Sequence, residues 1–309
     1  MLVQHSTQEK LLTGLSRLEA FIGNTPLFPM RFSSEKVRVY AKLEWQQLGG
    51  SVKTRPAFQI IKQAALDGCL DENRHLLDAS SGNTGIAYAH IGAALGIPVT
   101  LVLPENASRE RKQLLKALGT TIIYTSAFGS TDEAQEKAQE LASQHPDRYF
   151  YANQYGNPSN WQAHYEHTAI EIWRQTSGQL THFITGLGTT GTFVGTAKRL
   201  RELNPDISTI TLQPETALHG LEGWKHLETA KVPTIYDRTV ATENRVISTL
   251  AAYERLQKTS REEGLLLSPS AAANLQGALD LAKELEEGMI VTIFPDDALK
   301  YMDLYQQLF

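Results

Sequence analysis

The feature that most constrains this chain is an alternation of short apolar strands with helices, which covers residues 76–151 and then starts again. Apolar runs such as residues 99–103 alternate with helical patterns such as residues 108–118. Strand, helix and strand at this spacing are typical of a parallel sheet covered on both faces. Because the alternation restarts after residue 152, the sequence of 309 residues predicts two α/β units with a cleft between them.

Composition argues against several classes of function. The net charge is -5 and the basic residues are not clustered, which argues against nucleic-acid binding. The longest apolar runs have strand length, too short to cross a bilayer, and the first ten residues lack the apolar region of a secretion signal. Cys69 is the only cysteine, so no intrachain disulfide forms, and no His, Cys and carboxylate cluster has metal-ligand spacing. The sequence therefore predicts a cytoplasmic protein without a metal, a nucleic-acid partner or a membrane contact.

At finer scale, the pattern predicts a loose arm over residues 1–13 and a short helix over residues 15–22. It predicts little regular structure over residues 214–237, a largely helical stretch over residues 243–264 and a short strand over residues 265–267. Further helices are expected over residues 162–175 and 270–285, and a last strand over residues 289–294.

The first stretch with chemical potential is residues 48–57, LGGSVKTRPA, which lies between a strand candidate and a helical pattern. Gly49 and Gly50 let the backbone approach another group closely, and Lys53 falls at the loop-to-helix junction. Taken alone, this stretch is an ordinary helix start with Ser51 as N-cap and a solvated Lys53. Other parts of the chain decide between the two interpretations.

A second stretch, residues 186–192 (GLGTTGT), lies between a strand and a helix. Backbone N–H groups of such a loop, together with the helix N-terminus, bind anions, and a phosphate is the expected guest. The glycine spacing fits a dinucleotide fingerprint only loosely, because no acidic residue follows about 20 residues later at a strand end. A purely structural glycine turn is the other alternative.

Residues 80–85, SSGNTG, also follow a strand and precede a helix. They offer neutral donors and no charge, which suits a carboxylate held by backbone and hydroxyl groups near a helix N-terminus. The alternative is an N-cap with a tight turn. Ser270, in residues 268–273 (SPSAAA), is by itself best interpreted as an N-cap.

One lysine, one phosphate loop and one carboxylate loop together form the set that pyridoxal phosphate chemistry needs. The lysine forms a Schiff base, and the phosphate anchors the electron sink. A neutral serine near the pyridine nitrogen leaves that nitrogen unprotonated, which favours β-elimination and β-replacement over transamination.

With these motifs in order, the chain resembles the cysteine synthase (O-acetylserine sulfhydrylase) family of fold-type II pyridoxal phosphate enzymes, in particular its B-type members. The resemblance extends from residue 22 to about residue 296 and includes residues 22–27 (IGNTPL), 50–53 (GSVK), 81–85 (SGNTG), 104–108 (PENAS), 181–183 (THF), 188–192 (GTTGT) and 212–215 (LQPE), with Gln154. It implies two three-layer α/β domains with mostly parallel sheets, like the tryptophan synthase β-chain, with the cofactor in the cleft between them. The implied larger, cofactor-binding domain has residues 1–44 and 155–309, and the smaller, mobile substrate-binding domain has residues 45–154.

The resemblance also implies a role for individual residues. Lys53 is the Schiff-base lysine and the base for the α-proton, and Ser270 meets the pyridine nitrogen. Asn83 hydrogen-bonds the cofactor's 3′-oxygen, and the phosphate is held by Gly188, Thr189, Thr190, Gly191 and Thr192. The substrate carboxylate is held by Ser80, Ser81, Asn83, Thr84 and Gln154. An activated serine, O-acetylserine or O-phosphoserine, then passes through an aminoacrylate that sulfide or another sulfur donor attacks to give L-cysteine.

Some positions depart from the family pattern, notably Thr54, Ala169 and Pro269. Lys225, in the segment that borders the leaving group, favours O-phosphoserine, with a solvated loop as the alternative. The resemblance implies a homodimer and a serine acetyltransferase as a possible partner. Two alternatives remain open: another β-replacement, of the cystathionine β-synthase or diaminopropionate synthase type, and a catalytically quiet partner of the acetyltransferase. A dinucleotide-binding dehydrogenase is a third, and it rests on the glycine spacing alone.

Overall fold

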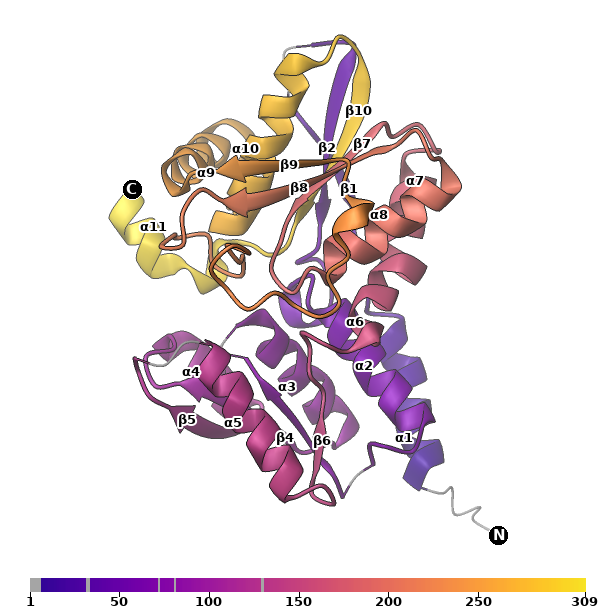
Figure 1. Ribbon diagram of the computed structural model, residues 1–309, viewed down its shortest axis with the longest axis vertical. Helices are drawn as coiled ribbons and strands as arrows, with labels where there is room; N and C mark the ends of the chain where they lie inside the picture. Colours follow the sequence, from indigo (N-terminus) through magenta and orange to yellow (C-terminus); the bar gives the residue numbers. More distant parts are fainter. Residues whose placement is uncertain (1–6, 32–33, 72, 81, 129–130) are drawn as a thin grey trace. The chain divides into compact units, whose positions relative to one another are not determined.

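A computed structural model describes residues 7–31, 34–71, 73–80, 82–128 and 131–309 (Figure 1). The chain divides into two compact units. The first unit comprises Met1–Gly23, Gln47–Gly49 and Lys53–Asn160. The second unit comprises Asn24–Gln46, Gly50–Val52 and Trp161–Phe309. Each unit is a sheet with helices, as the alternation in the sequence predicts.

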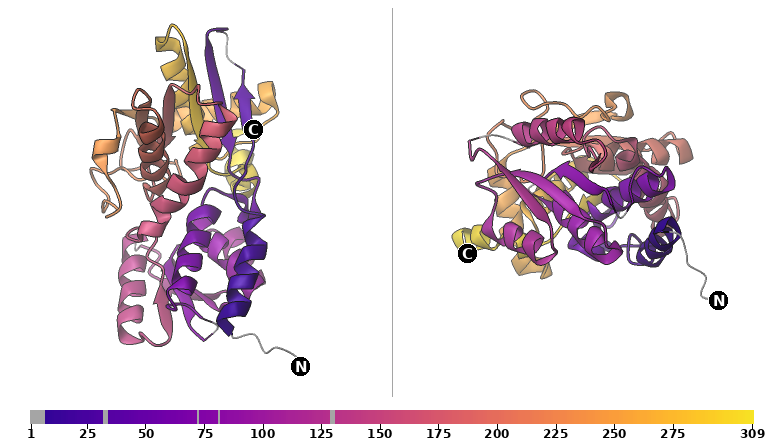
Figure 2. Two further views of the ribbon diagram at one scale, coloured as in Figure 1. Left: turned by 90° about the vertical axis from the view of Figure 1, so that its right-hand side faces the viewer. Right: turned by 90° about the horizontal axis from the view of Figure 1, so that it is seen from below.

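The first unit is built on a parallel four-stranded sheet in the order β5-β4-β3-β6. The strands are β3 (His75–Ala79), β4 (Val99–Pro104), β5 (Thr121–Thr125) and β6 (Tyr149–Tyr151). Neighbouring side chains of a strand point to opposite faces. Leu76 accordingly packs with α1 (Thr7–Glu19), α2 (Thr54–Leu66) and α3 (Asn83–Leu95), whereas Leu77 packs against α5 (Thr131–Gln144). A further helix, α4, spans Arg109–Ala117. The result is a three-layer unit (Figure 2).

The second unit is built on a six-stranded sheet in the order β1-β2-β10-β7-β8-β9. Only the pairing of β1 with β2 is antiparallel among the strands described. The strands are β1 (Leu27–Met30), β2 (Val37–Leu43), β7 (His182–Gly186), β8 (Ser208–Pro214), β9 (Glu243–Ile247) and β10 (Gly288–Phe294).

Helices cover both faces of this second sheet. One core packs α9 (Thr249–Glu263), α10 (Pro269–Glu284) and α11 (Met302–Leu308) on one face. The other core packs α7 (Ala169–Gln175) and α8 (Gly191–Leu203) on the opposite face. Before α7 the chain forms α6 (Pro158–Ala163) and a π-helical turn, His164–Thr168. Short 3-10 turns occur at Leu48–Gly50, Arg238–Val240 and Ala298–Lys300.

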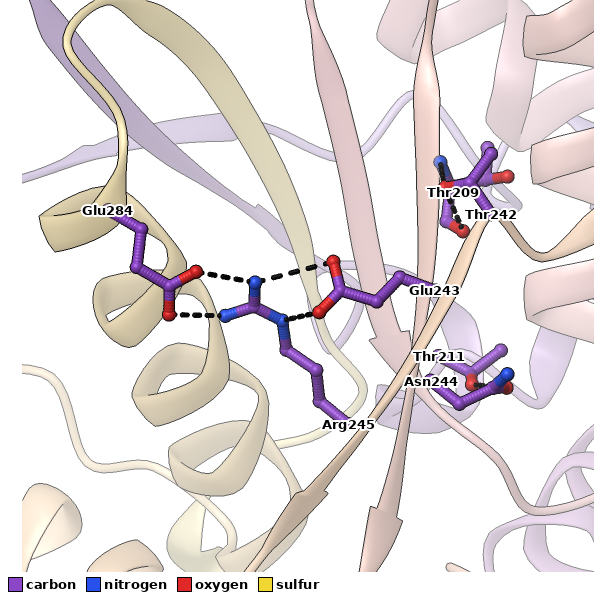
Figure 3. A network of polar contacts seen from close by, with 7 residues as sticks. All are labelled: Thr209, Thr211, Thr242, Glu243, Asn244, Arg245 and Glu284. Atoms are coloured by element: carbon purple, nitrogen blue, oxygen red, sulfur yellow. Dashed lines mark hydrogen bonds and ion pairs between the residues drawn. The ribbon is translucent and has the colours of Figure 1, made fainter.

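The edge strand β9 is held by side chains as well as by its ladder with β8 (Figure 3). Arg245 pairs with Glu243 of the same strand (2.6 Å) and with Glu284 of α10 (2.7 Å). On β8, the Thr209 amide donates to the Thr242 hydroxyl (2.9 Å), and Thr211 Oγ1 donates to Asn244 Oδ1 (2.5 Å). A charged, polar strand therefore takes an edge position, where exposed charges also discourage pairing with another chain.

Several local predictions are wrong. Helix α1 begins at Thr7, so much of the predicted loose arm is helical, and the predicted helix over residues 243–264 opens with strand β9. Residues 265–267 form only an isolated bridge, Leu267 to Asp297. The predicted helix over residues 162–175 is interrupted by the π turn. Strand β8 ends at Pro214, and residues 215–237 lack helices and strands, as predicted, yet Leu221 and Trp224 within them are buried.

The N-terminal helix lies in the first unit. The predicted larger domain includes residues 1–44, whereas α1 packs in the first unit, because Leu11 and Leu15 are buried against α2 and α3.

Within the described ranges, no helix combines the length and apolar character needed to cross a membrane.

Candidate active site

The loop after β3 is closed on itself by hydrogen bonds. The Ser80 hydroxyl accepts from the amides of Gly82 (3.3 Å) and Gly85 (3.0 Å). A Cβ on Gly85 would lie 2.9 Å from the Ser80 carbonyl and 2.8 Å from Leu101, so only glycine fits there. Asn83 begins α3, and its first-turn amides lack partners within the helix. This end of α3 therefore offers donors to an anion.

Gln154, just after β6, joins this loop from the neighbouring strand. The Thr84 hydroxyl donates to Gln154 Oε1 (2.6 Å), and Gln154 Nε2 donates to the Ala79 carbonyl (2.9 Å). The Gln154 main-chain amide donates to the Asp78 carboxylate (3.2 Å). All of these residues are buried. The predicted carboxylate residues Ser80, Thr84 and Gln154 are thus brought together, while Ser81 lies outside the described residues.

The stretch around Lys53 is a tight turn into α2. Gly49 and Gly50 have positive φ values of 76° and 62°, which glycine adopts without strain. Lys53 stands directly before α2 and is half-buried, and Ser51 does not cap this helix. Thr54, the departure from the family pattern, is fully buried and donates its hydroxyl to the Leu48 carbonyl (2.5 Å). Its role is to fix the turn that presents Lys53.

Helix α2, which follows Lys53, packs against α3, which starts at Asn83. Lys53 and Asn83 therefore stand at the starts of two neighbouring helices of the first unit. Asn83 is half-buried, like Lys53.

The loop after β7, in the second unit, is held by close backbone packing. A Cβ on Gly188 would lie 2.1 Å from the Gly223 carbonyl, and one on Gly186 would lie 1.9 Å from the Trp224 ring. The Lys225 amide also donates to the Leu187 carbonyl (2.7 Å). The segment around Trp224 thus fixes the loop from one side, and both glycines are required for that contact.

Thr190 ends this loop with an unusual conformation. Its φ is 70°, a left-handed value that is rare for a β-branched residue, and it directly precedes α8. Its hydroxyl is buried and has no hydrogen-bond partner among the residues that the structure describes. A buried hydroxyl without a partner, a strained backbone and the N-terminus of α8 together fit a phosphate group.

Helix α10 connects Ser270 to the same loop. The Asn274 side chain, fully buried, accepts from the Gly186 amide (2.7 Å) and donates to the Ile293 carbonyl of β10 (2.7 Å). Ser270 lies one turn earlier, on the same face of α10. The N-cap of α10 is Ser268 rather than Ser270, because Pro269 occupies the first helical position and Ser268 Oγ accepts from the Ala271 amide (3.2 Å). Buried Ser270 does not cap the helix, and its hydroxyl lies 3.2 Å from Ser268 Oγ.

The π turn supports the start of α8. His164 Nε2 lies 3.3 Å from the Thr192 hydroxyl, and its Nδ1 lies 2.9 Å from the Thr168 hydroxyl. A Cβ on Gly195 would lie 2.0 Å from the Trp161 carbonyl, so α8 and the π turn are in backbone contact.

The Lys225 side chain contacts its own segment of the chain, because its Nζ lies 3.5 Å from the Lys231 carbonyl.

The predicted site residues thus fall into two groups, one in each unit. Lys53, Ser80, Asn83, Thr84 and Gln154 belong to the first unit, and residues 188–192, Lys225 and Ser270 belong to the second. Sequence reasoning missed Asp78, Trp224 and Asn274. The available signals were an acid ending a buried apolar strand and an asparagine four residues after Ser270 in an alanine-rich helix. Among the described residues, no group of three or more His, Cys, Asp or Glu side chains is placed to hold a metal.

Comparison with known proteins gives consistent results. The model of the family described as "Pyridoxal-phosphate dependent enzyme" matches residues 18–296. The chain is 42% identical to cysteine synthase of Aquifex aeolicus, over 91% of this chain and 89% of the relative. It is 35% identical to cysteine synthase B of Pseudomonas aeruginosa, over 91% and 94% of the two chains. A solved hydrogen sulfide-producing enzyme of Fusobacterium nucleatum is 34% identical, with a TM-score of 0.86 over 92% of this chain and 98% of that one.

Proposed function

The chain belongs to the cysteine synthase family of pyridoxal-phosphate-dependent enzymes, and we propose that it makes L-cysteine from O-acetylserine or O-phosphoserine and sulfide or another sulfur donor. The observation that carries the proposal is the loop after β7. There Gly188 meets the Gly223 carbonyl, and the buried Thr190 hydroxyl has no partner among the described residues. When bound, pyridoxal phosphate supplies the electron sink for loss of the α-proton and the β-substituent.

On this proposal, residues 188–192 hold the cofactor phosphate, and Asn83 and Ser270 contact its ring. Ser270 is a neutral donor and acceptor on α10, whose Asn274 is bonded to the phosphate loop at Gly186. Lys53 provides the amine that holds the cofactor and, once released, its Nζ takes the α-proton of the substrate. Its half-buried place directly before α2 supports this role.

We further propose that Ser80, Ser81, Asn83, Thr84 and Gln154 hold the substrate carboxylate. A hydroxyl has one proton to donate, and Thr84 gives it to Gln154 Oε1 in this structure. Binding the carboxylate through Thr84 therefore requires this proton to turn from Gln154 to the substrate. The domain predicted over residues 45–154, which includes all of these residues, is proposed to be the mobile, substrate-binding one.

Three further features remain proposals. The positive charge of Lys225 would favour a phosphate leaving group, and its main chain is bonded to Leu187 beside the phosphate loop. A homodimer is the assembly we propose, with a serine acetyltransferase as a possible protein partner. The cytoplasm is the proposed compartment. The chain has a single cysteine, the exposed Cys69, and therefore lacks the intrachain disulfides that are common in proteins of oxidising compartments.

The test is a spectral titration of the holoenzyme with O-acetylserine, O-phosphoserine and serine, followed by addition of sulfide and product analysis. We expect one of the activated serines to change the visible absorption band, and sulfide to restore it with formation of L-cysteine. A response to serine and homocysteine alone would assign the enzyme to the cystathionine type. Tight binding of a serine acetyltransferase peptide without measurable turnover would make it a quiet partner.

A further inference from the structure

Asp78 occupies the point where the first unit's sheet ends beneath the carboxylate loop. Strands β3 and β6 pair in register from His75 with Tyr149 to Leu77 with Tyr151, and the Ala152 amide then donates to the Leu77 carbonyl. After Ala152 the chain turns at Asn153, whose φ is 48°. The ladder therefore supplies no carbonyl for the Gln154 amide, which needs a side-chain acceptor instead.

The Asp78 carboxylate fills that gap. Its Oδ2 accepts from the Gln154 amide (3.2 Å), and its Oδ1 accepts from the Ala79 amide (2.8 Å). Asp78 is 1% exposed, so it contacts neither solvent nor a ligand directly. Both amides need an acceptor, and a carboxylate provides two.

Asp78 binds the main-chain amide of Gln154, and the Gln154 side chain accepts the hydrogen bond of the Thr84 hydroxyl. Gln154 is fixed at its main chain by Asp78 and by Asn160, whose side chain donates to the Gln154 carbonyl (2.6 Å). With its main chain held, the Gln154 side chain reaches the Ala79 carbonyl and the Thr84 hydroxyl. A shift of the Gln154 backbone would therefore move the acceptor that sets the Thr84 proton.

We propose that Asp78 is a positioning residue for substrate recognition: by holding the Gln154 amide beyond the end of the β3–β6 ladder, it sets the geometry with which Thr84 and Gln154 receive the carboxylate. This inference rests on the proposed function only in naming an amino-acid carboxylate as the ligand. It goes further by assigning a role to a buried acid that does not touch substrate or cofactor.

The groups around Asp78 are neutral tyrosines rather than cations. Its interactions include Tyr88 on α3, Tyr151 on β6 and Tyr155 beyond β6; burial raises the pKa of each tyrosine, and the Asp78 charge adds to that rise. His75, at the other end of β3, has a pKa lowered by burial. Burial raises the pKa of Asp78 to about 7, so both protonation states are accessible near neutrality. Titration of the carboxylate can therefore be followed in the NMR shifts of the amides that it binds.

The first experiment compares two probes on the holoenzyme, L-alanine and L-alaninamide, by titration of the visible band. The two share an amine and a methyl group, and only alanine has a carboxylate. Asp78→Asn keeps one acceptor and turns an NH2 group toward the second amide. We expect it to lower the ratio of alanine to alaninamide affinity about tenfold, the size expected for a buried amide left unpaired. Asp78→Glu, which restores two acceptors, should recover most of the ratio.

Asp147→Asn is the matched control, because Asp147 is an exposed aspartate of the same unit. It should leave the ratio unchanged. A purely structural role for Asp78 would weaken both probes equally, so an unchanged ratio in Asp78→Asn would overturn the proposal.

The second experiment needs no variant, and covers the case in which Asp78→Asn does not fold. Amide NMR shifts of Ala79 and Gln154 are followed from pH 6 to pH 8 in the wild-type protein. Both should move together with one midpoint, because both amides bind the same carboxylate. A Gln154 shift that stays flat while the Ala79 shift moves would refute the contact. The NMR result does not depend on turnover, so failure of the proposed function, seen as no response to either activated serine, is distinguishable from failure of this inference.

Discussion

The loops after β3 and β7 have the same local plan and opposite internal bonding. Each follows a parallel strand, contains glycines and leads into a helix, α3 or α8. The loop after β3 uses its own hydroxyls, because Ser80 accepts from two amides and Thr84 donates to Gln154. The loop after β7 leaves the buried Thr190 hydroxyl without a partner among the described residues, and it is held by the Trp224 ring against Gly186 and by the Gly223 carbonyl against Gly188.

This difference suits two kinds of anion. In the loop after β3, the Ser80 and Thr84 hydroxyls already have partners when no ligand is bound, and the Thr84 hydrogen bond can be exchanged for one to a transient substrate carboxylate. A loop with an unsatisfied buried hydroxyl is incomplete until a ligand arrives, as expected for a cofactor that stays bound. We therefore expect changes in the loop after β7 to affect cofactor retention, and changes in the loop after β3 to affect substrate affinity with the cofactor still present.

The largest effect is expected at Lys53, whose loss neither loop can replace. Lys53→Ala should reduce turnover by roughly a thousandfold or more, because both the covalent attachment and the base are removed. The visible band of the purified protein should also change. Lys62→Ala, on the helix that follows Lys53, is the control, since the partly exposed Lys62 pairs with Glu19 (2.7 Å) and lies over the Phe58 ring (5.9 Å). Full turnover in Lys53→Ala would refute its assignment.

Next in size is a pair of glycine substitutions, one in each loop. In Gly188→Ala the new Cβ meets the Gly223 carbonyl at 2.1 Å, and in Gly85→Ala it meets the Ser80 carbonyl at 2.9 Å. We expect Gly188→Ala to weaken cofactor affinity by about a hundredfold, since backbone must move to relieve the clash. Gly85→Ala should keep the cofactor and lose substrate affinity by about tenfold. Cofactor absorbance after dialysis, followed by substrate titration, measures both, and identical behaviour of the two variants would show that the loops share one task.

The glycine loops were predictable from the sequence because strand, glycine turn and helix lie within a few neighbouring residues. The side chains that hold those loops were not. Asp78 meets Gln154 across 76 positions, and Gly186 meets Asn274 across 88 positions. Such contacts follow from which strands are neighbours, β3 with β6 and β7 with β10, and local patterns do not encode that order.

Other misses have local causes. Helix α1 contains Gly14, which lies between the predicted arm and the predicted short helix and weakens the helical signal there. Strand β9 is polar and mostly exposed, so it lacks the apolar run that reveals the buried strands. The departure at Thr54 had no interpretation until the structure showed its hydroxyl donating to the Leu48 carbonyl.

A smaller and more specific contrast separates the two threonines. Thr84→Val removes a hydrogen bond to Gln154, so the protein without ligand should lose about 1 kcal/mol of stability. Thr190→Val removes a hydroxyl with no partner among the described residues, so stability without ligand should be unchanged or slightly higher, while cofactor affinity falls by about tenfold. Urea unfolding of the cofactor-free proteins and a cofactor titration give the two numbers. A loss of stability in Thr190→Val would mean that its hydroxyl is bonded within the protein.

The smallest expected effect is a pH dependence confined to the loop after β3. Burial raises the pKa of Asp78 to about 7 from 3.8, so between these values the folded chain holds a proton that the unfolded chain has lost. The contribution of Asp78 to the free energy of unfolding therefore falls as pH rises, and between pH 6 and pH 8 it should fall by about 1 kcal/mol. Urea midpoints of the wild type and Asp78→Asn at both pH values isolate this contribution, because Asn does not titrate and other groups cancel in the difference. If the wild type and the variant change in parallel, Asp78 is ionised throughout and its carboxylate holds Gln154 at every pH in this range.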